Sequence, residues 1–266
     1  ARHDLSRRSD TQTAPDPSDM GDRADVTRSR RIGRSLLWPV RIVAAVATVA
    51  VTVLFAVVGI KALTWPDVAA LSSREPETTA FMEQARTDGI EVRWRFVPYG
   101  RISDNLKRAV VVAEDISFFS HNGFDTQELK VAAREAIEGK RVRGASTITQ
   151  QLAKNLWLSP SRSPVRKLEE GVLTWQLERH LDKRRILELY LNVVEFGPGV
   201  YGAEAAAQRY FGTSAAELSE HQSAELAASL PRPSSWQPGI TRRGYLRYVV
   251  QIRSRMERAA WVDKLL

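Results

Sequence analysis

An acidic residue at the end of an apolar run is the first position in this sequence that could do chemistry. Glu114 directly follows the apolar residues 109–113, so we expect it at the end of a buried helix or in the loop beyond it. A carboxylate in such a place is partly desolvated, which raises its pKa towards the range that suits a general base. The nearby His121 and the pair Phe118 and Phe119 are, by themselves, more typical of structural roles.

A second polar segment runs from Gly144 to Asn155. Gly144 frees the backbone and Ser146 or Thr147 can cap a helix, so a helix is expected to begin there. Its polar face and its apolar stripe lie opposite one another, with Thr147, Gln151, Lys154 and Asn155 on the first and Ile148, Leu152 and Leu156 on the second. A polar helix face alone is usually ordinary solvated surface.

A third segment combines both charges at helical spacing. Glu170 follows Arg166 by four residues and Lys167 by three, so the three side chains would meet on one side of a helix. By itself this pattern is typical of an exposed, weakly stabilising ion-pair helix.

The elements that hold these segments belong to a chain of 266 residues, which is enough for one large domain or two small ones. There are 39 Lys and Arg against 31 Asp and Glu, a net charge of +8 that favours anionic partners. A hydrophobic content of 43% excludes a wholly disordered chain. The absence of cysteine excludes disulfides, cysteine-bound zinc and thiol catalysis.

The N-terminal part predicts a disordered basic tail over residues 1–41 and a transmembrane anchor helix over 42–61. Residues 42–60 contain no charge, and 19 residues at ~1.5 Å each cover roughly 28 Å of hydrocarbon. A buried core helix fits less well, because no polar face interrupts the run. A cleaved signal peptide is the stronger alternative, given the pair Arg30 and Arg31, but the long preceding region and the lack of a small-residue site after Ile60 disfavour it.

Cations on one side of this run predict its orientation. The segment before the uncharged run carries five arginines and no acid between them: Arg28, Arg30, Arg31, Arg34 and Arg41. The segment after the run contains the acids Asp67, Glu75 and Glu77. The positive-inside tendency then puts the N-terminus in the cytoplasm and residues 62–266 outside the membrane. This location argues against nucleic acid as a partner despite the basic charge.

Residues 62–266 predict one mainly helical domain. We expect a short strand within 91–99, a helix from Leu106 to Ala113, and a second apolar stripe at Leu168, Val172 and Trp175. The run 197–199 breaks the chain, a helix follows over 203–211, and Ser214 with Glu217 and Ser219 with Gln222 have capping-box spacing. The basic residues 242–258 form either an amphipathic helix on anionic lipid or a terminal helix docked on the domain.

Together these segments resemble a known family. The stretches EDISFFSHNGFD, GASTITQQLAKNLWL, RKLEE, RRILELYLNVVEFGPGVYGAEAAAQRYF and ELAASLPRP are similar, in order and spacing, to the five motifs of the peptidoglycan glycosyltransferases. The chain resembles the monofunctional biosynthetic form, without a penicillin-binding transpeptidase domain. The resemblance implies a lysozyme-like, two-lobed helical fold with a membrane-associated jaw. It also implies a transferase that polymerises lipid II into glycan strands at the bacterial cytoplasmic membrane, with its catalytic domain on the extracytoplasmic side.

The resemblance also assigns roles to residues. It implies that Glu114 is the catalytic base and that Glu170 is the second catalytic glutamate. The residues that it places in the cleft or in the sugar and pyrophosphate sites are Asp115, Phe118, His121, Ser146, Thr147, Gln150, Gln151, Lys154, Asn155, Arg166 and Lys167. The fourth motif, with Glu188, Tyr190, Asn192 and Gly202, has a structural character. Ala145 departs from the second glycine that the family commonly has, which would slightly restrict the loop.

The transfer chemistry fits these positions. A sugar hydroxyl attacks an anomeric carbon with inversion, Glu114 removes the hydroxyl proton, and the cations of Lys154, Arg166 and Lys167 stabilise the departing pyrophosphate. Glu170 is expected to orient these cations or to hold a divalent cation such as Mg or Mn. Two alternatives are a lysozyme-like hydrolase, which needs no cation cluster, and a non-catalytic membrane scaffold. Expected partners are lipid II, the nascent glycan strand and the cell membrane, with cell-division or elongation proteins and a separate transpeptidase as further candidates.

Overall fold

The computed structural model describes residues 38, 41–53, 55–56, 59–61, 63–138, 146–161 and 163–266. The chain divides into two compact units, residues 1–65 and 66–266. In the described part of the chain, no helix is both long enough and apolar enough to cross a membrane. The predicted tail lies almost wholly outside the described residues, as do residues 54, 57 and 58 of the predicted anchor, so both stay predictions.

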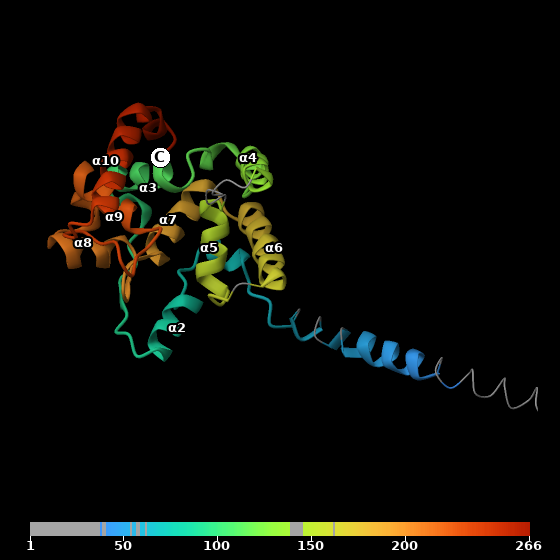
Figure 1. The fold of residues 1–266 in the computed structure, drawn as a ribbon. Helices are drawn as coiled ribbons and strands as arrows, with labels where there is room; N and C mark the ends of the chain where they lie inside the picture. The colour runs from blue at the N-terminus through green and yellow to red at the C-terminus, as the bar shows by residue number, and fades with distance from the viewer. Residues whose placement is uncertain are drawn as a thin grey trace, which may run out of the picture. The chain divides into compact units, whose positions relative to one another are not determined.

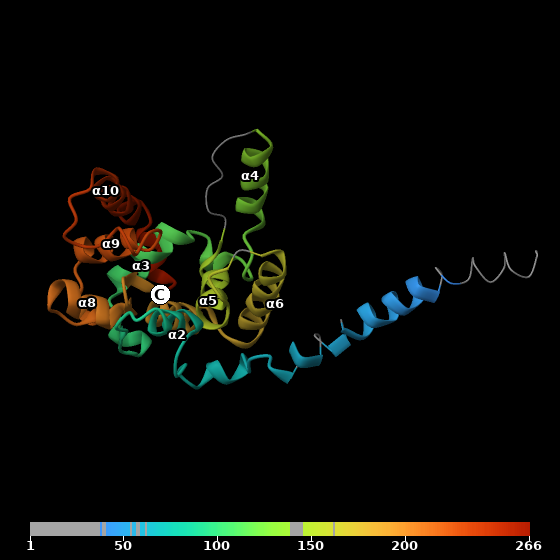
Figure 2. The same ribbon diagram turned by 60° about the horizontal axis from the view of Figure 1, so that its bottom comes forward.

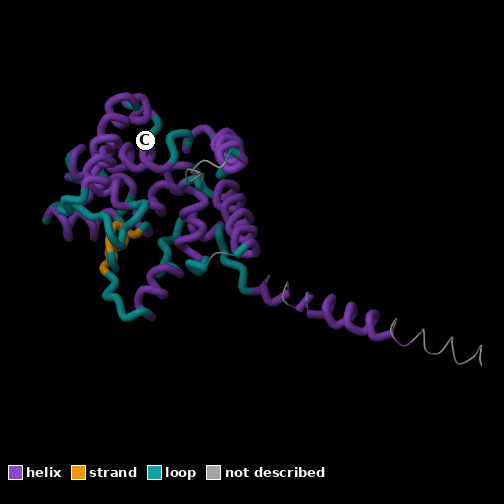
Figure 3. Tube along the Cα trace, viewed as in Figure 1, coloured by secondary structure: helices purple, strands orange, loops and turns teal. Residues whose placement is uncertain are grey.

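The second unit is mainly helical, as the sequence predicted (Figures 1 and 3). Its α-helices are α2 (Ala80–Thr87), α3 (Asp104–Glu114), α4 (Thr126–Ile137), α5 (Ile148–Trp157), α6 (Pro164–His180), α7 (Lys183–Val193), α8 (Ala203–Phe211), α9 (Glu220–Ser229) and α10 (Arg243–Arg258). Short 3-10 helices are η1 (Ala69–Ser72), η2 (Tyr99–Arg101), η3 (Phe118–Ser120), η4 (Ala215–Glu217) and η5 (Ala260–Lys264).

The core forms around two packed groups of helices. In one, α3 packs against α9 and α10, and in the other α5 packs against α6 and α7. Leu106, Val110 and Val111 of α3 and Ile148 and Leu152 of α5 are fully buried, as their spacing predicted. Figure 2 shows α4 projecting away from these packed helices. The central helices therefore hold the ends of α3 and α5 in fixed places.

A small sheet was only partly predicted. The strand expected within 91–99 is limited to β1 (Arg93–Trp94), which pairs in parallel with β3 (Val200–Tyr201). β2 (Glu195–Gly197) pairs antiparallel with β3. The sequence indicated only a chain break at this turn. Gly199 in this turn has φ +70°. It lies so close to the backbone of Glu91 that an added Cβ would be 2.2 Å from the Glu91 carbonyl oxygen.

The predicted capping residues are confirmed. Thr147 and Gln150 form a capping box at the start of α5, since the Thr147 hydroxyl accepts from the Gln150 N–H while the Gln150 side chain accepts from the Thr147 N–H. The boxes of Ser214 with Glu217 and Ser219 with Gln222 begin η4 and α9. Gly144 and Ala145, which precede the first of these boxes, lie outside the described residues.

The apolar stripe predicted on α6 is exposed. An apolar stripe normally faces the core, but Leu168, Val172 and Trp175 of α6 are 71%, 41% and 55% exposed. This helix buries a different face, with Leu173 and Leu177 directed inward.

The basic helix α10 is docked on the domain, the second of the two alternatives, because its apolar side packs against α9 and α3. Its buried residues are Tyr245, Val249, Ile252 and Met256.

Candidate active site

Glu114 is the last residue of α3, and its side chain lines a cavity of about 710 Å³. The predicted position at the end of a buried helix is confirmed. The start of α5 supplies another wall of this cavity. Of the predicted site residues, the cavity brings together Glu114, Asp115, Ser146, Thr147 and Gln151.

Two hydrogen bonds in series hold the Glu114 carboxylate. The Gln151 amide nitrogen donates to Glu114 Oε2 at 2.8 Å, and the Tyr190 hydroxyl donates to Gln151 Oε1 at 2.9 Å. Burial raises the pKa of Glu114, whereas the Gln151 hydrogen bond and the positive charge of Lys154 oppose that rise. Burial also raises the pKa of Tyr190 well above its usual range, so its hydroxyl stays protonated and donates. The second bond fixes which end of the Gln151 amide faces the carboxylate.

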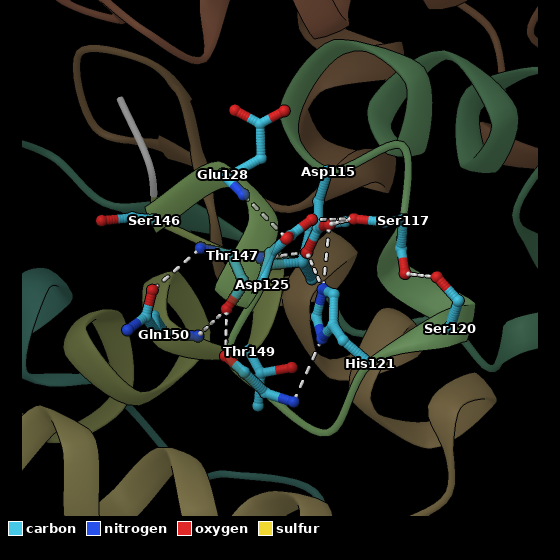
Figure 4. Close-up of polar contacts among 12 residues, drawn as sticks. Asp115, Ser117, Ser120, His121, Asp125, Glu128, Ser146, Thr147, Thr149 and Gln150 are labelled. Atoms are coloured by element: carbon cyan, nitrogen blue, oxygen red, sulfur yellow. Dashed lines mark hydrogen bonds and ion pairs between the residues drawn. The ribbon is translucent and has the colours of Figure 1, made fainter. Parts of the chain in front are cut away.

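A second network ties the loop after α3 to the start of α5 (Figure 4). Asp115 Oδ2 accepts from the Ile148 N–H at 3.0 Å, and Asp115 Oδ1 lies 3.0 Å from His121 Nε2. The Gly123 N–H donates to His121 Nδ1 at 3.1 Å, so in the neutral ring Nε2 carries the proton and donates to Asp115. The Thr147 hydroxyl donates to the Gly123 carbonyl at 2.7 Å. These contacts set the position of Glu114 relative to α5.

The predicted charge cluster on α6 is confirmed as a contact. Arg166 Nη1 lies 2.9 Å from Glu170 Oε2, and Lys167 Nζ contacts the other carboxylate oxygen. Glu170 is only 3% exposed, so this cluster differs from the solvated ion pair that the spacing alone would suggest. Arg166 Nε is buried and has no hydrogen-bond partner among the residues that the structure describes. A buried donor without a partner is costly unless a ligand supplies the acceptor.

Lys154 of α5 connects the two groups electrostatically. Burial lowers its pKa, while the carboxylates of Glu170 and Glu114 both raise it, so its ammonium group interacts with both acids. Arg166 and Lys167 also act on it, in the opposite direction. Lys154 therefore responds to the charges of Glu114 and of the α6 cluster, although Lys154, Arg166 and Lys167 are not among the described residues that line the Glu114 cavity.

Other predicted site residues are largely buried and are not among those that line the cavity. Phe118 is fully buried, and the Lys183 ammonium lies 4.5 Å from its ring centroid. Gln150 is occupied as the α5 cap, and Asn155 is buried. Phe118 and Gln150 therefore act through contacts inside the domain. His121 likewise acts through Asp115 rather than from the cavity wall.

The structure adds residues that the sequence reasoning did not select. The cavity that contains Glu114 is also lined by Tyr248, Arg255 and Arg258 of α10 and by Trp261 of η5. The spacing of Arg255 and Arg258, three apart on a basic helix, shows that they share a face, but not which element that face meets. Tyr190, which is expected to be a structural residue of the fourth motif, also reaches the Glu114 network, because its hydroxyl donates to Gln151.

The fourth motif otherwise has the predicted structural character. Asn192 makes three hydrogen bonds with its side chain: it donates to the carbonyls of Val97 and Glu188, and it accepts from the Val97 N–H. Glu188 accepts from the Tyr99 N–H at 2.6 Å. Together they fix the segment that leads into α3.

The donor set around Glu170 does not fit a resident divalent metal. Both of its oxygens contact cations, Arg166 and Lys167, which compete with a metal for the same lone pairs. In the described ranges, no cluster of three or more His, Asp or Glu side chains could hold a metal ion. We therefore assign no chemical step to such a metal.

Comparison with known proteins agrees with this geometry. The family model described as transglycosylase matches residues 61–258. A biosynthetic peptidoglycan transglycosylase of Thiobacillus denitrificans is 50% identical over 189 residues, covering 68% of this chain and 82% of that protein. A protein of the same name from Herminiimonas arsenicoxydans is 51% identical over 168 residues, covering 60% of this chain and 73% of that protein. Another from Paraburkholderia xenovorans is 45% identical over 216 residues, covering 78% of this chain and 88% of that protein. The resemblance found in the five motifs is confirmed, and the chain belongs to the transglycosylase family.

Proposed function

We propose that this protein is a monofunctional peptidoglycan glycosyltransferase that polymerises lipid II, with Glu114 as its general base. The observation that carries the proposal is the position of Glu114: a carboxylate whose pKa is raised by burial lines a cavity and interacts with the cation of Lys154. Its family membership supplies the reaction class. A base with a raised pKa suits proton removal near neutral pH.

The reaction forms one bond and breaks one. The 4-hydroxyl oxygen of the acceptor lipid II attacks the anomeric carbon of the growing, lipid-linked glycan, with inversion at that carbon. The bond from this carbon to the diphosphate oxygen breaks, and its electron pair leaves with the lipid diphosphate. Glu114 takes the hydroxyl proton as the new bond forms, an effect worth about two to four powers of ten.

Lys154, Arg166 and Lys167 stabilise the negative charge that grows on the diphosphate. Fixed cations of this kind bind the transition state more tightly than the ground state. The buried Arg166 Nε, which no described residue engages in a hydrogen bond, can donate to a phosphate oxygen. Glu170 contacts two of these cations, so we assign it a positioning role.

The hydrolase and scaffold alternatives are less well supported. A hydrolase expels a sugar alcohol and needs no cations beside the leaving group. A scaffold would not need a Gln151 amide that donates to a partly buried carboxylate and is itself oriented by the Tyr190 hydroxyl.

The membrane anchor over residues 42–61, with a cytoplasmic N-terminus and an extracytoplasmic catalytic domain, is part of the proposal. The uncharged run and the preceding arginines support it. The exposed apolar face of α6 also suits an enzyme that works on a lipid-linked substrate. Its residues are Val165, Leu168, Val172 and Trp175. A transpeptidase and division or elongation proteins are further proposed partners.

The test uses the purified full chain in detergent with labelled lipid II. We expect polymer from the wild type and a loss of at least about 100-fold in the Glu114→Gln variant. Glu204→Gln is the matched control, since Glu204 is a buried carboxyl outside the cavity that accepts from the Ala215 N–H at 2.8 Å. Shortening of preformed strands would identify a hydrolase, and no change in either substrate would identify a scaffold.

A further inference from the structure

The cavity that contains Glu114 has a wall built by the C-terminal part of the chain. Arg255 and Arg258 of α10 and Trp261 of η5 line it. The family match ends at residue 258, and the five motifs end earlier, at Pro233. The C-terminal wall, as we call these three residues, therefore needs an explanation beyond the family motifs.

The C-terminal wall is attached directly to the helix that ends in Glu114. Arg255 Nη1 donates to the Val112 carbonyl at 3.4 Å, and the Tyr248 hydroxyl donates to the Ala113 carbonyl at 3.4 Å. Asp263 of η5 lies 2.6 Å from Arg108 Nη1 of α3. Since α3 carries both the base and these anchor points, the wall keeps a fixed relation to the catalytic carboxylate.

The chemistry of the wall differs from that of the diphosphate cations. Lys154, Arg166 and Lys167 are absent from the described residues that line this cavity. Trp261 is 51% exposed and offers an aromatic face, which suits the apolar face of a sugar ring. Arg255 and Arg258 are exposed residues, and guanidinium groups suit carboxylates, which arginine can bind through paired hydrogen bonds.

Acidic side chains complete the charge pattern of the cavity. Asp125 and Glu128 also line it. The hydrogen bond from Ser117 lowers the pKa of Asp125, so this carboxylate is ionised near neutral pH. A cavity with both charges suits a ligand that carries carboxylates together with a free amine, as a peptide does, better than a diphosphate alone.

We propose that the C-terminal wall binds the sugar and peptide parts of the glycan strand: Trp261 stacks on a sugar ring, and Arg255 and Arg258 bind a carboxylate of the peptide stem. This inference rests on the proposed function, because that function makes a peptide-bearing glycan the substrate. A cavity of about 710 Å³ is within the usual range for a bound ligand of disaccharide size.

The experiment measures binding without turnover. The full chain with Glu114→Gln, in detergent, is titrated calorimetrically with short soluble glycan strands, either bearing their peptides or after enzymatic removal of the peptides. Adding Arg255→Gln and Arg258→Gln is expected to weaken binding of the peptide-bearing strand about tenfold and to leave the stripped strand within about twofold. Adding Trp261→Ala is expected to weaken binding of both strands.

Arg253→Gln is the matched control, because Arg253 is an exposed arginine of the same helix that does not line the cavity. Any one of three results would overturn the proposal. They are an effect of Arg253→Gln equal to that of the double arginine variant, an equal loss of affinity for both strands in the double arginine variant, and no binding of either strand. Thermal unfolding of each variant checks that the wall has folded. A failure of the wall is distinct from a failure of the proposed function, which polymer formation by the wild type tests separately.

Discussion

Removal of the Tyr190 hydroxyl tests whether Gln151 controls the catalytic carboxylate. In the folded protein, Tyr190 donates to Gln151 Oε1, which directs the amide N–H of Gln151 to Glu114 at 2.8 Å. An N–H donor favours the ionised carboxylate. In the Tyr190→Phe variant the amide is free to turn its oxygen towards Glu114, and that arrangement favours the protonated acid.

The expected size follows from one exchanged hydrogen bond. A net hydrogen bond contributes about 1 to 1.5 kcal/mol, which corresponds to about one pKa unit. Burial already raises the pKa of Glu114, and the substitution raises it further. The acid limb of the pH profile of kcat/KM should therefore move up by about one pH unit, with up to about tenfold less activity below the new pKa and recovery above it.

The assay is polymerisation of labelled lipid II across a range of pH, with thermal unfolding measured in parallel. Tyr201→Phe is the matched control, because Tyr201 is 2% exposed and its hydroxyl donates to the Phe81 carbonyl at 3.2 Å, outside the Glu114 network. Both variants should lose about 1 to 2 kcal/mol of stability. Superimposable pH profiles for Tyr190→Phe and the wild type would refute the positioning role.

Three further predictions concern other parts of the site. Gly202 has φ +80°, and an added Cβ would lie 2.6 Å from the Asn192 carbonyl oxygen. Gly202→Ala should therefore lower the free energy of unfolding, measured with denaturant, by about 3 kcal/mol or more. The control Gly100→Ala, at a position with no atom within 4 Å of an added Cβ, should lower it by less than about 1 kcal/mol. The folded protein holds the Glu114 proton more tightly than the unfolded chain does, because the pKa of Glu114 is raised in the folded state. The contribution of this group to folding stability therefore falls as pH rises from the ordinary glutamate range towards the raised pKa. Thermal unfolding of Glu114→Gln, measured across this pH range, should lack this decline. Lys154→Ala should lower kcat about 100-fold or more in the lipid II assay, with KM changing much less; a change in KM alone would contradict its transition-state role.

Local sequence patterns were enough to predict the parts of the site that depend on one helix. The apolar run before Glu114 gave its position at the end of α3, and the spacing of Arg166, Lys167 and Glu170 gave their contact. The capping chemistry of Thr147 gave the start of α5. Each of these features depends on residues within about one helical turn of one another, which is the range over which spacing is informative.

Features that depend on packing between distant segments could not be read from spacing. Tyr190 meets Gln151 across 39 positions, and Arg255 meets Val112 across 143. The apolar pattern of α6 was equally ambiguous, because the helix carries apolar residues on two faces and only packing against α5 decides which one is buried. β2 and β3 have three and two residues, too few for an alternating pattern to appear.

Helix α5 is the element that relates the base to the cations. Thr147 caps it and contacts the loop after Glu114, Gln151 contacts Glu114 itself, and Lys154 interacts with both Glu114 and Glu170. Gln151 and Lys154 are three positions apart, so about 4.5 Å of helix rise separates the residue that contacts Glu114 from the proposed leaving-group cation on the same helix. The opposite face of α5 is buried against α6 and α7, which prevents this register from changing. In the proposed mechanism a rigid register matters because both charges would act on the same transition state, and a shift of either one would weaken the stabilisation that the other provides.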